Sequence, residues 1–171
     1  MATETDLLLR DAQDGTDYAL TNVSTYCTKH ATTGVYYIPF DDTAVESILF
    51  SGTMPQWYDS AQTLKLDIYY YASNAGDGDC EFEVSVEAVT HDVDTLDMDS
   101  ATSFDTANSG SDTCRAMQGH PALCVVTLAT KDSVAAGDKI RIILERDAND
   151  ATNDDQTGDI NVTGIRLYQS T

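Results

Sequence analysis

Apolar and polar residues alternate along much of this chain. The alternation is longest between Gln62 and Val89, where a Gly/Asn/Asp-rich turn at 73–79 separates two runs. One parity of both runs is apolar: Leu64, Leu66, Ile68, Tyr70, Cys80, Phe82, Val84, Val86 and Ala88. A period of two is typical of strands that bury one face. The pattern predicts a long antiparallel hairpin packed on a second sheet, because a lone hairpin is only marginally stable in water.

Other short runs of similar character predict the remaining strands, at 5–10, 18–23, 35–40, 44–52, 122–129, 139–146 and 160–168. Pro39 lacks an N–H donor, so it belongs at a sheet edge or a strand end. The apolar phase of the last run shifts across Gly164, which predicts a β-bulge there. No long stretch has helical periodicity. We therefore expect an all-β protein with roughly eight or nine strands in a two-sheet antiparallel sandwich of jelly-roll type.

The 171 residues have the length of one domain. We expect residues 1–17 to form an N-terminal arm or terminal strand, and residues 18–171 to form a single β-sandwich domain. The tract 91–121 has no clear periodicity and is expected to be one long loop, of a kind that is often functional or ordered by a partner. The run 122–129 reads as a fully buried strand, and 147–159 as an acidic loop.

The formal net charge is −20 and the sequence pI is near 4.1. Such a charge repels phosphate backbones and anionic lipid headgroups, so neither nucleic acid nor a membrane is an expected partner. The first ten residues lack the basic start and apolar core of a secretory signal, and no apolar run is long enough to span a bilayer. Synthesis in the cytosol is therefore expected.

The sequence contains little that indicates catalysis, a metal or a cofactor. The three histidines lie far apart, and no nucleophile elbow or distinctive carboxylate pair is visible. Residues 92–103 lack the glycine and glutamate of an EF-hand loop. We predict a non-enzymatic protein with no catalytic residue, no metal site and no cofactor. Whether the acidic loop 147–159 binds a cation is left open.

Arg146 and the cysteines carry two further predictions. Arg146 ends a strand directly before the acidic loop, where a guanidinium can hold loop carboxylates in a forked geometry. A ligand-binding role for this arginine is the alternative. Cys114 and Cys124 bracket a loop and would pair in an oxidising medium, but the absence of an export signal favours free thiols.

Three segments together resemble β-sandwich virion proteins of tailed bacteriophages. These are ESILFSGTMPQWYD at 46–59, AGDKIRIILERD at 136–147 and GDINVTGIRLY at 158–168, and the resemblance spans roughly residues 44–168. It implies a capsid decoration or cement protein, often trimeric, that stabilises the phage head. The implied partners are other copies of the chain and the major capsid protein or another virion protein. The implied location is the virion, after synthesis in the host cytoplasm. A tail or fibre component is the alternative.

The residues that would carry binding differ between two classes of function. For a virion protein we predict that apolar side chains of the arm and of the long loop form the interface: Leu7, Leu8, Leu9, Phe104 and Met117. The rival class is a carbohydrate-binding module, in which Trp57 and Tyr58 form a sugar platform and Tyr69 and Tyr71 also stack on sugars. For Trp57 beside Tyr58 we favour a structural plug over an exposed platform, because a loop-borne aromatic side chain more often closes the end of a β-sandwich.

Overall fold

The computed structural model describes residues 5–7, 28–97 and 102–170. These residues form ten β-strands and no helix: β1 (Thr5–Leu7), β2 (Thr28–Lys29), β3 (Tyr36–Phe40), β4 (Glu46–Thr53), β5 (Thr63–Ala72), β6 (Asp79–Val89), β7 (Asn108–Thr113), β8 (Ala122–Thr127), β9 (Lys139–Arg146) and β10 (Ile160–Ser170). The described part of the chain therefore contains no helix with the length and hydropathy needed to cross a bilayer.

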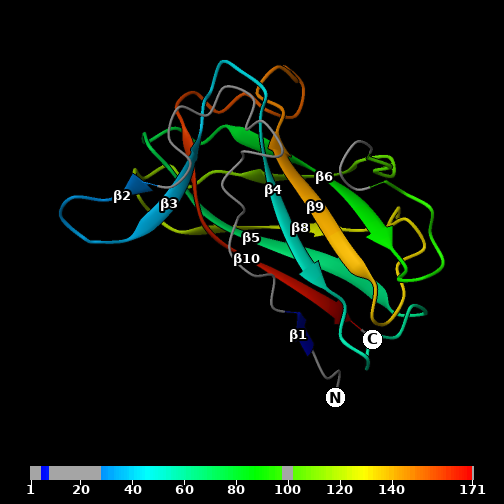
Figure 1. Cartoon of the computed structure of the whole chain (residues 1–171). Coiled ribbons are helices and arrows are strands. Elements are labelled where there is room, and N and C mark those ends of the chain that lie inside the picture. The colour runs from blue at the N-terminus through cyan, green and yellow to red at the C-terminus, as the bar shows by residue number, and fades with distance from the viewer. Residues whose placement is uncertain (1–4, 8–27, 98–101, 171) are drawn as a thin grey trace.

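The strands form two facing antiparallel sheets (Figure 1). The large sheet has the order β2-β3-β10-β5-β8, and β1 also pairs with β10. The small sheet has the order β4-β9-β6-β7. From β3 to β10 the chain changes sheet at almost every connection. The two four-stranded arrangements, β3-β10-β5-β8 and β4-β9-β6-β7, have the strand order of a jelly roll. The predicted all-β, two-sheet jelly-roll fold is confirmed.

The two strands predicted at 62–89 do not pair as a hairpin, although the residues predicted to face the core do so. β5 belongs to the large sheet and β6 to the small sheet, so the turn between them crosses from one layer to the other. Both strands point their apolar parity into the same core, where Tyr70 and Phe82 meet edge to face with ring centroids 5.6 Å apart. The alternation of apolar and polar residues indicates which face of a strand is buried, but it does not indicate which strand pairs with it.

Three further strand predictions are confirmed in detail. β9 has the predicted bounds, with Ile140, Ile142 and Leu144 buried in the core. The register between β10 and β5 shifts between Val162 and Gly164, at the predicted bulge. Pro39 of β3 pairs with β10. On the other side of β3, strand β2 pairs only with Tyr36 and Tyr37, so it does not extend to Pro39, as expected for a residue without an N–H donor.

Two sequence predictions in the second half of the chain need correction. The tract 91–121 is not one loop, because Asn108–Thr113 form β7 and pair with β6. The strand at 122–129 is not fully buried, because β8 lies at the edge of the large sheet with Leu123 43% and Val125 44% exposed. The predicted strand at 18–23 and the predicted division at residue 17 lie outside the described residues.

Candidate functional site

The outward face of the large sheet carries a row of tyrosines. On β5 the odd-numbered residues point away from the core, because Leu64, Leu66, Ile68 and Tyr70 fill it. The β-ladder register places Tyr71 of β5 in one row with Asn161 of β10 and Pro39 of β3. Tyr37, two residues before Pro39, meets Tyr71 edge to face with ring centroids 5.8 Å apart. We call the outward side chains of Tyr37, Tyr71, Tyr69, Asp67 and Arg166 the tyrosine face.

An ion pair lies beside the tyrosines on the same face. Arg166 of β10 is the cross-strand partner of Asp67 of β5. Its Nε lies 3.0 Å and its Nη2 2.6 Å from Asp67 Oδ2. The Asp67 side chain is 2% exposed and that of Arg166 31% exposed, and the guanidinium carbon lies 4.6 Å from the centroid of the Tyr168 ring. A charged pair held this firmly presents hydrogen-bonding groups in a fixed place.

This face is exposed to solvent at Tyr69 and along the edge strand β8, whereas Asp67 beside them is buried. Tyr69 is 38% exposed, and its direct neighbour across the ladder is Leu123 of the edge strand β8. Asp67 is likewise opposite Val125. An apolar recess of about 120 Å³ at the Gly164 bulge lies on the inner side of this sheet instead, because Phe50 of the small sheet and the core-packed Ile38, Val162 and Ile165 are among its lining residues. Exposed aromatic rings, apolar neighbours and a few fixed polar groups are the usual constituents of a ligand site.

The predicted platform of Trp57 and Tyr58 is divided by the fold. Trp57, in the connection between β4 and β5, is 49% exposed. Tyr58 is buried in the core cluster, and the ammonium of Lys131 lies 5.8 Å from the centroid of its ring. Tyr58 therefore acts as the plug, and the two residues do not form a joint surface.

The residues predicted for a subunit interface have different environments. Leu7 is the last residue of β1, opposite Leu167 of β10, while Leu8 and Leu9 lie outside the described residues. Met117 is 57% exposed. Phe104 is half-buried, with the guanidinium of Arg141 5.8 Å from its ring centroid. Phe104 thus packs on its own chain.

Arg146 is fully buried and holds the acidic loop, as predicted. Its Nε and Nη2 donate to the two carboxylate oxygens of Asp154 at 2.9 and 2.8 Å. The remaining donors bind backbone carbonyls of Phe40, Asp41, Gln156 and Gly158. Burial lowers the pKa of Arg146, but the hydrogen bonds and charge of Asp154 outweigh this and hold it above its ordinary value. This arginine is structural, since its side-chain hydrogen bonds link β9 to the end of β3, to the β3–β4 connection and to the β9–β10 connection.

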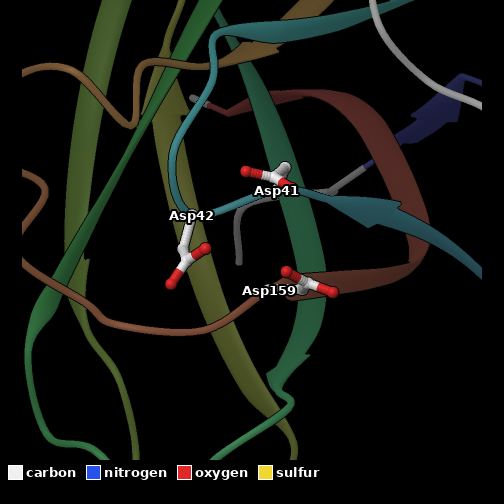
Figure 2. Close-up of side chains that lie close together, drawn as sticks. All are labelled: Asp41, Asp42 and Asp159. Carbon is white, nitrogen blue, oxygen red and sulfur yellow. The ribbon is translucent and has the colours of Figure 1, made fainter.

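Three carboxylates lie close together near this arginine. Asp41 and Asp42 follow β3 and Asp159 precedes β10, and one oxygen of each lies within 4.8 Å of the others (Figure 2). Burial, followed by the charges of Asp41 and Asp42, raises the pKa of Asp159. Oxygen ligands of this kind suit Ca²⁺. Part of the set is already used, because Asp41 Oδ1 accepts the N–H of Thr43 at 2.7 Å and Asp42 Oδ2 that of Gly158 at 2.6 Å.

The other carboxylates of the acidic loop are used within the fold. Asp147 and Asp150 accept hydrogen bonds from backbone N–H groups two residues further on. Asp154 binds Arg146, and Asp155 Oδ1 accepts the N–H of Asp79 at 2.7 Å. Among the described residues, the group that meets the geometry of a cation site is therefore the one at Asp41, Asp42 and Asp159, to which the loop contributes one residue.

The cysteines of the described chain are free thiols. Cys80, Cys114 and Cys124 are buried and unpaired by disulfides, so the pairing of Cys114 with Cys124 does not occur. Cys124 Sγ lies 3.5 Å from the carbonyl oxygen of Gly110, and Cys80 Sγ lies 3.5 Å from that of Asp112. Burial raises the pKa of Cys124 to about 12, so this thiol is protonated and packs as a small apolar group.

No protein-family model and no curated protein sequence matches this chain. Among solved structures, TmCBM61 in complex with β-1,4-galactotriose is similar at a TM-score of 0.40 and 12% identity, over 84% of this chain and 80% of that one. TmCBM27, a carbohydrate-binding module that recognises mannan, is similar at 0.40 and 11%, over 85% and 81%. A Paenibacillus sp. cycloisomaltooligosaccharide glucanotransferase matches at 0.48 and 16%, over 92% of this chain and 18% of the enzyme. At these values the likeness concerns the general β-sandwich architecture alone.

Sequence reasoning missed the tyrosine face as a unit. Tyr69 and Tyr71 were recognisable from their parity on β5. Tyr37 and Arg166 lie far away in sequence and join them only because β10 inserts between β3 and β5. The signal available was the bulge at Gly164, since a bulge next to an aromatic-rich strand often accompanies a functional site.

Proposed function

We propose that this chain is a non-catalytic module that binds carbohydrate on the tyrosine face. The observation that carries the proposal is the combination of exposed Tyr69, the Tyr37–Tyr71 pair and the fixed Asp67–Arg166 pair on one side of one sheet. A sugar ring has an apolar C–H surface that packs on an aromatic ring and hydroxyl groups that bind charged side chains. The tyrosine face offers both kinds of contact within one stretch of sheet.

The fold itself does not decide the function. Jelly rolls serve as viral capsid domains and as lectins, so the topology is compatible with both classes considered from the sequence. The proposal therefore depends on the surface chemistry of this chain. The TM-scores of the similar carbohydrate-binding modules are too low to add to it.

The proposal is tested by glycan binding of the full chain and of two variants. A glycan array and calorimetry with β-1,4-galactan, mannan and xylan would be run on wild type, Tyr69→Ala and Trp57→Ala. We expect wild type and Trp57→Ala to bind the same glycan, and Tyr69→Ala to lose at least about tenfold in affinity, because an aromatic contact residue is removed. Matching melting temperatures would show that both variants are folded. Loss of binding in Trp57→Ala alone would place the site at the β4–β5 connection instead.

A virion surface protein is the second candidate, favoured by the edge of the large sheet. Leu123 and Val125 of β8 and Tyr69 of β5 form an exposed apolar strip, of the kind that protein interfaces use. On this proposal the chain forms homotrimers and binds a capsid or other virion protein. Mass photometry over a range of concentrations separates the candidates, since a virion component is expected to form trimers or larger bodies. A monomer at all concentrations would count against this candidate.

A further inference from the structure

The carboxylate of Asp67 has one oxygen with several partners and one with none. Oδ2 accepts two N–H groups of Arg166, and the Tyr69 hydroxyl lies 3.4 Å from it. Oδ1 is buried, and no described residue donates a hydrogen bond to it. A buried carboxylate oxygen without a donor is unfavourable, because the water it has lost is not replaced. Such an atom on a binding face marks a position where a donor is missing.

The protein neighbours of Asp67 do not supply this donor. The residue opposite on β8 is Val125, whose side chain has no polar atom. The residue opposite on β10 is Arg166, and its bonds to this carboxylate go to Oδ2. Tyr69 follows two residues later on the same face, and its hydroxyl is also directed at Oδ2, at the long distance of 3.4 Å. Tyr69 is 38% exposed, so its ring is accessible to a ligand directly beside this carboxylate.

We propose that Asp67 Oδ1 accepts a hydrogen bond from one hydroxyl of a neutral sugar stacked on Tyr69, an inference that rests on the proposed function. A hydroxyl is the donor that a sugar carries at several positions, and a hydrogen bond to a carboxylate is stronger than one to a neutral acceptor. The bond fixes which hydroxyl of the sugar points at the sheet. Asp67 thereby selects among glycans that all stack equally well on a tyrosine.

The charges around the site favour a neutral ligand over an acidic one. Asp67 offsets the charge of Arg166 on this face, Lys65 of β5 adds one positive charge, and the whole chain has a formal net charge of −20. An anionic glycan would be repelled by the negative charge of the chain and by the carboxylate of Asp67. We therefore expect uronate-containing and sulfated glycans to bind more weakly than neutral ones.

The test is calorimetry on the wild-type chain with the neutral array glycan of highest affinity and its mono-deoxy analogues, each lacking one hydroxyl. We expect one analogue to lose about 10- to 100-fold in affinity and the others to bind nearly as the parent does. Asp67→Asn should bind the parent glycan more weakly than wild type does, by a similar factor. This variant should bind the parent glycan and the critical deoxy analogue with similar affinity, because the hydrogen bond is absent in both cases. Asp138→Asn is the matched control, because Asp138 is also buried but lies in the turn before β9, where its carboxylate accepts the N–H of Ala135.

The outcomes separate this inference from the function on which it rests. If every deoxy analogue binds with equal affinity while Tyr69→Ala no longer binds the glycan, the role of Asp67 is wrong but carbohydrate binding by the tyrosine face is still supported. Tighter binding of an oligogalacturonate than of any neutral glycan would overturn the preference for neutral sugars. An array without a bound glycan would overturn both proposals. If Asp67→Asn does not fold, the deoxy series on the wild-type chain decides alone.

Discussion

At the scale of single residues, the buried ionic groups of this protein have separate tasks. Arg146 is 0% exposed and ties two connections to the sandwich, whereas Arg166 lies on the outer face and pairs with Asp67. The role of Arg146 was predictable, because an arginine between an apolar strand and an Asp-rich loop has few other partners. The role of Arg166 was not, because its partner Asp67 lies 99 residues earlier in the chain.

Replacing Arg146 is expected to destabilise the fold strongly. In Arg146→Met the carboxylate of Asp154 stays buried without its partner, and four backbone carbonyls lose their donor. Removal of one member of a buried ion pair costs roughly 3–5 kcal/mol of unfolding free energy. Urea unfolding measures this, with Arg115→Met as the control, since Arg115 is exposed. A loss as small as that of the control would contradict a structural role for Arg146.

At the scale of elements, the sequence predicted strands well and their neighbours poorly. Parity along a strand depends on local burial, so β4, β5, β6, β9 and β10 were recognised. Pairing depends on contacts between distant segments, which is why β5 and β6 were joined in one hairpin although they lie in different sheets. β7 was missed because its sequence, NSGSDT, has no apolar alternation. It forms by backbone pairing with β6, and Asn108 adds a side-chain bond to the carbonyl of Val84 at 3.1 Å.

Two glycines, Gly158 just before β10 and Gly164 at its bulge, are expected to differ in their tolerance of a side chain. Gly158 has φ +100°, and a Cβ there would lie 2.7 Å from Asn74 Nδ2. Gly164, at the bulge, has no heavy atom within 4 Å of such a Cβ. We expect Gly158→Ala to lose about 2 kcal/mol of unfolding free energy from backbone strain, and Gly164→Ala to stay near the wild-type value. Thermal or urea unfolding of both variants gives the comparison. Equal stability of the two would mean that the left-handed backbone at Gly158 is not required.

At the scale of the whole molecule, the chain is an acidic sandwich whose two outer faces differ. The outer face of the small sheet carries glutamates, and burial, followed by repulsion from Glu83 and Asp147, raises the pKa of Glu145. The tyrosine face lies on the opposite side and has a different chemistry. The net charge of −20 was visible in the sequence, but the separation of the two surfaces follows from the jelly-roll topology, which alternation along the chain does not encode.

The carboxylates with raised pKa values predict that mild acid stabilises the protein. Burial is the main cause of the raised pKa of Glu46, Asp159 and Glu145. The folded state therefore binds more protons than the unfolded state near these pKa values, and unfolding free energy rises as pH falls from 7 toward about 5. Below that, protonation of Asp41, whose pKa is lowered by its bonds to Thr43, removes stability. Melting temperatures measured from pH 8 to 3 should pass through a maximum, and a steady fall from pH 7 downward would contradict this.

The central claim is that the outward face of the large sheet binds a glycan, and chemical-shift mapping tests it most directly. The ¹⁵N-labelled chain would be titrated with neutral β-linked oligosaccharides while backbone amide shifts are recorded. We predict saturable shifts that cluster on β5 and β10 around Tyr69, Asp67 and Arg166, with little change on the small sheet. Shifts centred on Trp57, or no saturable shift with any neutral oligosaccharide, would contradict the claim.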